Sequence, residues 1–265
     1  MAKKAQQVSK GMATAARTAG SLIIEQPKRA RLGLEILGTA DLIQNRFSQK
    51  SFEQMLRKHM GLSTHREAKK PRDIIASATI LNTSGRVCIP PQAIKAGMLL
   101  VASKDETLKK FGRMLRTYIY IEGESIPIDF ESMIPRVDMV KNSGLNRVPE
   151  ERFRPSFRNW KARLTIQYDE SKIRPQTIVN LLFGAGDVGV GEWRPQNNGT
   201  YGTYTVSRSI ESSKELAEVR ALCAPPIQSL TVPEWALDAD IDMDVLAKIM
   251  AGEHVSSDCT AEAAE

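Results

Sequence analysis

The chain has 265 residues, of which 42% are hydrophobic and 26% charged, with a mean hydropathy of −0.30. This composition excludes fibrous and wholly disordered chains, and the length allows one or two domains. No uncharged apolar run approaches the roughly 18 residues of a membrane-spanning helix, and no apolar signal stretch follows the polar N-terminus. Three widely spaced cysteines form no disulfide framework, so we expect a cytoplasmic protein.

The net charge of +6 is distributed unevenly along the chain. Residues 1–72 carry 15 Lys and Arg against 5 Asp and Glu, whereas residues 207–265 carry 4 against 12. A basic front and an acidic end favour a polyanion-binding surface with an acidic tail. Two solvated ends that merely attract each other explain the pattern equally well.

The first third of the chain predicts two strands and a helix. Residues 1–28 lack apolar periodicity and predict a flexible basic arm. Alternation of Leu32, Leu34 and Ile36 predicts a strand to about Leu37. Ser51 and Gln54 form a capping-box pattern that opens a short amphipathic helix, and a second strand is expected over residues 74–81.

The middle of the chain alternates between helix and strand signals. A helix is expected after Pro91, because proline suits the first helical turn, and another after Pro175. Strands are expected at 135–140, 160–168 and 201–206, and a hairpin from 118–121 and 126–128. This order predicts an α+β, ferredoxin-like (RRM-like) antiparallel sheet with two packed helices over residues 29–206. Residues 207–265 are expected to add an acidic helical extension, with helices after Ser212 and at 243–250 and a disordered end.

Residues 184–189 read Gly-Ala-Gly-Asp-Val-Gly and match the dinucleotide pattern G-x-G-x-x-G. That pattern binds pyrophosphate only between a strand and the start of a helix, whereas here an expected helix comes first and Pro195 follows. The sequence also lacks the H-E-x-x-H, C-x-x-C, G-x-S-x-G and P-loop motifs. We therefore expect no cofactor, no metal and no catalysis.

Two segments carry the pattern of a nucleic-acid contact. The first is a glycine-rich stretch whose backbone could lie against phosphate, with a cation and stacking faces at Arg194, Trp193 and Tyr201. The second mixes basic and aromatic residues and supplies the candidate phosphate contacts Arg152, Arg154, Arg158, Lys161 and Arg163. A glycine hinge with Trp193 in the core, and aromatic core anchors, are equally good interpretations.

Residues 89–98, Ile-Pro-Pro-Gln-Ala-Ile-Lys-Ala-Gly-Met, resemble the I-P-x-S-x-hydrophobic-Lys helix opening of the RAMP superfamily, the ferredoxin-like backbone subunits of CRISPR effector complexes. Residues 32–38 resemble the first strand of that family, and its glycine-rich loop is matched by Gly189, Gly191, Gly199 and Gly202. The resemblance implies RNA binding with Lys95 as a phosphate contact. Residues 189–195 are also similar to bacteriophage proteins with a G-x-G-E-W-R-P signature.

These patterns predict a non-catalytic, phage-type protein that binds single-stranded RNA or DNA through phosphate contacts. Its partners are then a single strand and further copies of the chain along it, with no membrane and no small-molecule cofactor. A phage structural or assembly protein is the first alternative, in which the charge asymmetry drives association. A RAMP-type endoribonuclease is the second, although no Asp matches the cleaving Asp of some family members. Lys95 and Arg194 are expected side by side in one cationic trough.

Overall fold

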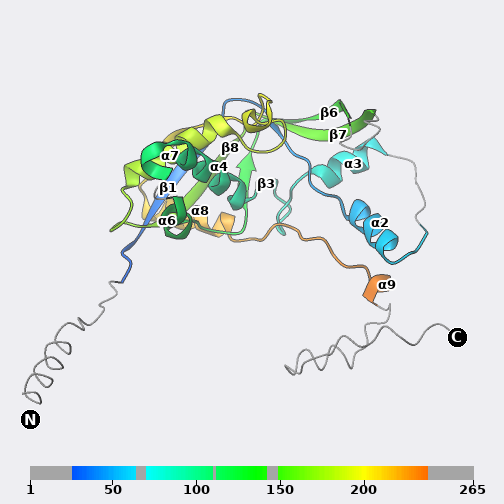
Figure 1. Ribbon diagram of the computed structural model, residues 1–265, viewed down its shortest axis with the longest axis horizontal. Helices are drawn as coiled ribbons and strands as arrows, with labels where there is room; N and C mark the ends of the chain where they lie inside the picture. The colour runs from blue at the N-terminus through cyan, green and yellow to red at the C-terminus, as the bar shows by residue number, and fades with distance from the viewer. Residues whose placement is uncertain (1–25, 64–69, 110–111, 142–148, 238–265) are drawn as a thin grey trace, which may run out of the picture.

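The computed structural model describes residues 26–63, 70–109, 112–141 and 149–237 (Figure 1). The helices are α2 (Gln49–His59), α3 (Pro71–Ala78), α4 (Pro91–Lys104), α5 (Glu106–Lys109), α6 (Gly112–Tyr118), α7 (Pro175–Val188), α8 (Ser213–Cys223), α9 (Glu234–Leu237) and the 3-10 turn η1 (Pro195–Asn197). The strands are β1 (Arg29–Gly38), β2 (Leu42–Ile43), β3 (Cys88–Ile89), β4 (Ile119–Ile121), β5 (Ile126–Asp129), β6 (Ser132–Lys141), β7 (Pro149–Arg158), β8 (Lys161–Asp169) and β9 (Tyr204–Ile210).

The main sheet has the order β3-β5-β8-β1-β9, with β4 also paired to β8 and every pairing antiparallel. β4 and β5 pair with the same strand one after the other, so they form one strand interrupted at residues 122–125. With α4 before this interrupted strand and α7 between β8 and β9, the chain follows the β-α-β-β-α-β path of a ferredoxin-like domain. The expected α+β fold is confirmed.

The two long helices cover one face of this sheet. Leu34 of β1 lies opposite Leu164 of β8, and both are fully buried against α4 and α7, which Figure 1 shows packed together over the strands. The helices approach closely at Gly97, where an added Cβ would lie 3.1 Å from the Cβ of Ala185. Alternation along β1 and β8 therefore places every second side chain in the core.

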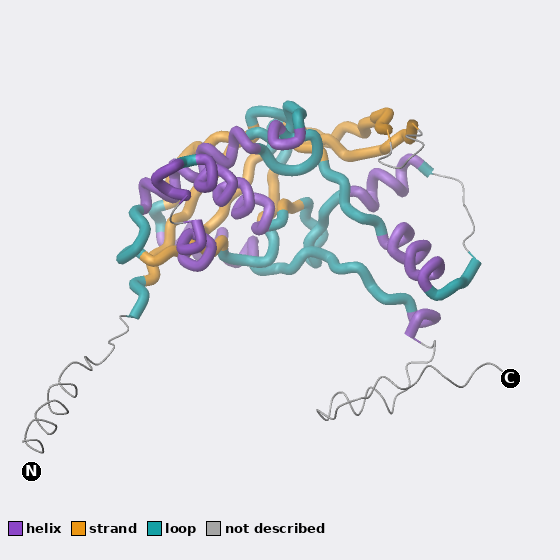
Figure 2. The backbone as a smooth tube through the Cα atoms, viewed as in Figure 1, coloured by secondary structure: helices purple, strands orange, loops and turns teal. Residues whose placement is uncertain are grey.

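A second sheet, of order β2-β7-β6, lies to one side of the first (Figures 1 and 2). β6 and β7 pair along their whole length, from Ser132 opposite Arg158 to Lys141 opposite Pro149. We call this pair the ribbon. One of its faces receives the glycine-rich loop after α7, and α3 packs against β7.

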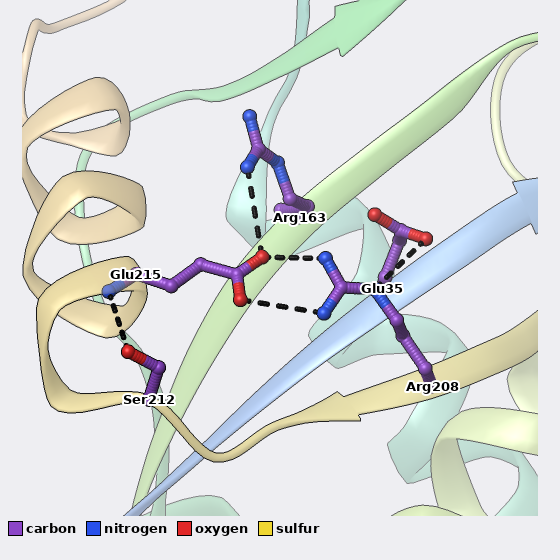
Figure 3. A network of polar contacts seen from close by, with 5 residues as sticks. All are labelled: Glu35, Arg163, Arg208, Ser212 and Glu215. Carbon is purple, nitrogen blue, oxygen red and sulfur yellow. Dashed lines mark hydrogen bonds and ion pairs between the residues drawn. The ribbon is translucent and has the colours of Figure 1, made fainter.

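Helix α8 covers the face of the main sheet that α4 and α7 leave open. Its Leu216 lies against Gly33 of β1, where an added Cβ would meet the Leu216 side chain at 2.6 Å. Above the strands, Glu215 pairs with Arg208 and lies 3.8 Å from Arg163, while Arg208 also lies 3.4 Å from Glu35 (Figure 3). Helix α8 therefore covers this second face of the main sheet and is joined to it by ion pairs.

The Glu215 network predicts a pH-dependent contribution to stability. Hydrogen bonds from Arg208 hold the pKa of Glu215 below its ordinary value. A depressed pKa in the folded state stabilises the fold above the ordinary glutamate pKa, near 4.3, and this contribution is lost as the pH falls through the lower, folded value. Glu215→Gln is therefore expected to lower the Tm at pH 7 and to match the unmodified protein in acid, as measured by thermal unfolding across pH. Glu218→Gln, on an exposed turn of α8, is the control; an equal Tm loss at every pH would contradict the ion-pair account.

Several expected elements differ from the structure. Residues 71–78 form α3 rather than a strand, because Pro71 starts a helix whose buried side chains, Ile75 and Ala78, are three residues apart. Residues 118–121 and 126–128 form no hairpin, since β4 and β5 both pair with β8. The cap of α2 is Ser48, whose side chain accepts a hydrogen bond from the Ser51 backbone, so the helix begins before the expected capping box.

The glycine motif and the flanking strands also differ from expectation. The first five residues of 184–189 belong to α7, which ends at Val188, so the motif is a helix end and not a phosphate loop. Residues 149–158 form β7, a strand that the sequence did not predict, and β9 runs from Tyr204 to Ile210 rather than from 201 to 206. The basic arm over 1–25, the helix expected at 243–250 and the acidic end lie outside the described residues.

Candidate nucleic-acid interface

The glycine-rich loop, residues 189–203, folds back on itself between α7 and β9. Gly189 and Gly202 have φ values of 76° and 69°, which only glycine adopts without strain, and the Val190 amide donates to the Gly202 carbonyl at 2.9 Å. Trp193 has a φ of 50°, an uncommon backbone state for a side chain of its size. Its carbonyl accepts a hydrogen bond from the Tyr201 amide at 3.0 Å. The loop thus holds two aromatic rings at its outer end.

Arg136 of the ribbon lies against both of these rings. Its guanidinium carbon is 5.1 Å from the centroid of Trp193 and 4.8 Å from that of Tyr201, within cation–π distance. It also donates hydrogen bonds of 2.7 Å to the Tyr201 hydroxyl and to Asp138. Partial burial lowers the pKa of Arg136, but its hydrogen bonds to Asp138 and Tyr201 raise the pKa by more, so it lies above its ordinary value. Arg136 therefore joins the ribbon to the loop.

Arg154, opposite Arg136 on β7, is the most unusual polar residue described. Only 1% of it is exposed, and its Nε and Nη1 have no hydrogen-bond partner. Its Nη1 lies 3.7 Å from Asp138, and its guanidinium carbon lies 5.4 Å from the centroid of Trp193. Burial lowers the pKa of Arg154, because the buried cation has lost its hydration. Buried polar groups are rarely left without a hydrogen bond, so these two nitrogens are an exception among the described residues.

We call Arg136, Asp138, Arg154, Trp193 and Tyr201 the arginine–aromatic cluster. The sequence had indicated three of them as site residues, and it missed Arg136 and Asp138. Both lie in the strand expected at 135–140, where charged residues alternate with Val137 and Met139. The alternation is typical of a strand with one polar face. A local pattern does not show that β7 is the partner of this strand, and it is this pairing that sets the polar face against the glycine-rich loop.

The other predicted contacts on β7 and β8 lie at separate places. Arg152 is half-buried beside the cluster, opposite Asp138, and Arg158 is exposed at the foot of the ribbon, 3.5 Å from Asp41. Lys161 is exposed at the start of β8. Arg163 lies on the sheet face closed by α8, where it faces Glu215, so the basic segment does not form one continuous phosphate track.

Lys95 and Arg194, which were expected to lie side by side, contact different elements. Lys95 Nζ donates to the carbonyl of Arg116 in α6 at 2.9 Å. Arg194 Nη1 donates to the carbonyl of Gly191 at 2.9 Å, and the Gly191 segment packs on β2. Each cation is thus engaged by a carbonyl in its own neighbourhood. No interaction joins the two within the described residues.

A scan against protein-family models finds no match, and neither does a search of curated proteins. Among solved structures, a chain of the Type III-B Cmr-beta complex bound to cognate target RNA, determined by cryo-EM, is 12% identical, with a TM-score of 0.44 over 77% of this chain. The present chain covers 66% of that chain, just under two thirds of its length. Cmr6 from Pyrococcus furiosus is 8% identical, with a TM-score of 0.34 over 69% of this chain and 100% of Cmr6.

Two further findings concern what the described residues contain. None of their helices combines the length and apolar composition that crossing a bilayer requires. No group of three or more His, Cys, Asp or Glu in this part of the chain is arranged to hold a metal ion.

Proposed function

We propose that the chain binds single-stranded nucleic acid at the arginine–aromatic cluster. The observation that carries the proposal is the buried guanidinium of Arg154, in which two nitrogens close to Trp193 have no hydrogen-bond partner. A phosphate oxygen pairs with the guanidinium fork better than any neutral group does. Neighbouring Trp193 and Tyr201 offer faces on which bases stack with little regard to sequence.

Arg154 can reach a phosphate only if Trp193 moves aside. The strained φ of Trp193 favours such a movement, because leaving the left-handed region relieves a cost that glycine alone avoids. Gly191 before Trp193 and Gly202 after it, both at positive φ, flank the segment and can act as hinges. In the proposed complex a base replaces Arg136 against Trp193, and Arg136 turns with Arg152 towards the backbone phosphates.

The expected result is salt-sensitive binding that depends on Trp193. With about four phosphates neutralised, affinity for a single strand should fall roughly 50-fold between 50 and 200 mM salt. Trp193→Ala should weaken binding about tenfold, since one stacked base is worth about 1–3 kcal/mol. Fluorescence anisotropy of labelled uridine and thymidine oligonucleotides measures both effects and separates RNA from DNA.

Trp235→Ala is the matched control. Trp235 also lies beneath an arginine, with the guanidinium of Arg57 4.4 Å from its ring, but that pair belongs to α9 and α2. This variant should bind like the unmodified protein. If the protein does not bind a single strand, or if its affinity does not change with salt, the proposal is wrong. If Trp193→Ala and Trp235→Ala lose the same affinity, the cluster is not the binding site.

An assembly role, the second candidate, has one observation in its favour. Met133, Val137 and Met139 of edge strand β6 are 44%, 58% and 67% exposed and lie on one side of the ribbon. Copies of a phage-type structural protein could associate through this stripe. Light scattering on protein freed of nucleic acid tests it: particles much larger than one chain, dispersed by Val137→Asp, favour assembly, and a monomer excludes it. Assembly only on addition of a strand fits multimerisation along nucleic acid instead.

A further inference from the structure

A pocket of about 500 Å³ lies away from the arginine–aromatic cluster. It opens between the first turn of α4, the interruption between β4 and β5, and the segment that follows α8. Its volume is in the range of small-molecule sites. The residues that matter for its chemistry are Pro91, Gln92, Lys95, Tyr120, Glu124 and Pro226.

The wall made by residues 122–125 is held in place by the chain after α8. The amides of Glu124 and Ser125 donate to the carbonyl of Cys223 at 2.9 and 3.1 Å. The Ser125 hydroxyl donates to the carbonyl of Pro225 at 2.6 Å. Gly123, at a φ of 95°, approaches Cys223 so closely that a side chain would not fit. The pocket is therefore formed in advance of any ligand.

The polar groups of this pocket have little else to bind. Within the described residues, the side chains of Gln92, Tyr120 and Glu124 have no hydrogen-bond or ion-pair partner, and Lys95 donates one hydrogen bond, to Arg116. Partial burial lowers the pKa of Lys95, because the ammonium has lost part of its hydration. Tyr120 is 55% exposed, so one face of a flat ring is open at the rim. A positive group, a negative group and an aromatic face thus meet around one hollow.

We infer that this pocket binds a guanine base. Guanine presents a carbonyl oxygen beside two N–H donors on one edge, which matches the ammonium of Lys95 and the carboxylate of Glu124. Uracil places carbonyls on both sides of its single N–H, and adenine and cytosine place an acceptor next to the amino group, where a carboxylate is repelled. Tyr120 supplies the stacking face, with proline rings completing the apolar wall. The inference rests on the proposed function in one respect: the guanine would belong to the bound strand.

The test titrates the full chain with each of the four ribonucleoside monophosphates and with inorganic phosphate, followed by amide NMR. Stacking plus one bidentate edge contact predicts a Kd for GMP on the order of 1 mM, with UMP about tenfold weaker. Glu124→Gln should abolish the preference for GMP. Tyr120→Ala should lower the affinity for all four nucleotides, whereas Tyr120→Phe should leave it unchanged. Glu218→Gln, an exposed glutamate on α8 outside the pocket, should change nothing.

The outcomes separate the pocket from the proposed function. Equal affinity for the four nucleotides, or the same shifts with phosphate alone, would overturn the guanine assignment. If uridine oligonucleotides bind while GMP shifts no pocket resonance, the pocket inference fails and the proposed function stands. If GMP binds while no oligonucleotide does, the proposed function fails and the pocket remains as a mononucleotide site.

Discussion

Arg154→Met is expected to make the protein more stable and a weaker binder at the same time. The variant removes two buried N–H groups that lack partners, each of which costs about 1–3 kcal/mol in the folded state. It also removes the repulsion that Arg152 and Arg136 exert on Arg154. Asp138 loses the 3.7 Å contact of its Oδ2 with Arg154, but its Oδ1 keeps the 2.7 Å pair with Arg136, so the carboxylate still has a cation partner. Methionine fills a similar volume without a charge to desolvate.

The two effects are measured separately. The variant also loses the attraction that Glu192 and Asp138 exert on the Arg154 charge, which offsets part of the gain. We expect a net stabilisation of about 1 kcal/mol, which raises the Tm by roughly 2–4 °C in a chain of this size. Binding to a single strand should fall at least tenfold, because a hydrogen bond to a charged group is worth about 1.5–3 kcal/mol. Thermal unfolding and anisotropy on the same preparation give both numbers.

Arg86→Met is the control for charge alone. Arg86 pairs with Asp129 on an exposed surface at 3.0 Å, so its loss should change neither the Tm nor binding by much. Destabilisation of the Arg154→Met protein by several kcal/mol would mean that Arg154 is a satisfied structural ion. In that case it would not be a reserved ligand contact, and the cluster would lose its main support.

Local patterns predicted those strands and helices whose buried side chains recur at a regular spacing within one stretch of sequence. Apolar residues alternate with other residues along β1 and β8 because one face of these strands meets α4 and α7, and both helices begin at prolines that suit a first turn. The hydrophobic pair Ile74 and Ile75 suggested a strand where Pro71 starts α3. β4 and β5 were misjudged as a hairpin because their true partner, β8, lies some forty residues further along the chain.

The candidate site divides in the same way. The sequence indicated Trp193, Tyr201 and Arg154 because they lie in short segments rich in glycine or in basic and aromatic residues. Arg136 and Asp138 join them only through the register of β6 on β7, which pairs Arg136 with Arg154. Burial of Arg154 could not be foreseen either, because arginine is rarely buried and nothing beside it in the sequence marks it as an exception. Residue type indicated the chemistry, and long-range pairing decided which residues share it.

Gly186→Ala is expected to destabilise the protein, although helix propensity alone predicts the opposite. Alanine is better than glycine inside a helix by about 1 kcal/mol, and Gly186 lies within α7. A Cβ at this position would overlap the backbone carbonyl of Tyr204 in β9, which cannot rotate away as a side chain does. Overpacking typically costs about 1–3 kcal/mol, and we expect the upper end because backbone must move, for a net loss of about 2 kcal/mol.

Gly184→Ala, two residues earlier in the same helix, is the matched control. There the added Cβ would meet only methyl groups of Val101, at 2.9 and 3.1 Å, and a small side-chain shift relieves the contact. The propensity gain then offsets the packing cost, and the midpoint of urea unfolding should stay close to that of the unmodified protein. A Gly186→Ala protein as stable as the Gly184→Ala protein would mean that α7 does not lie so close to β9.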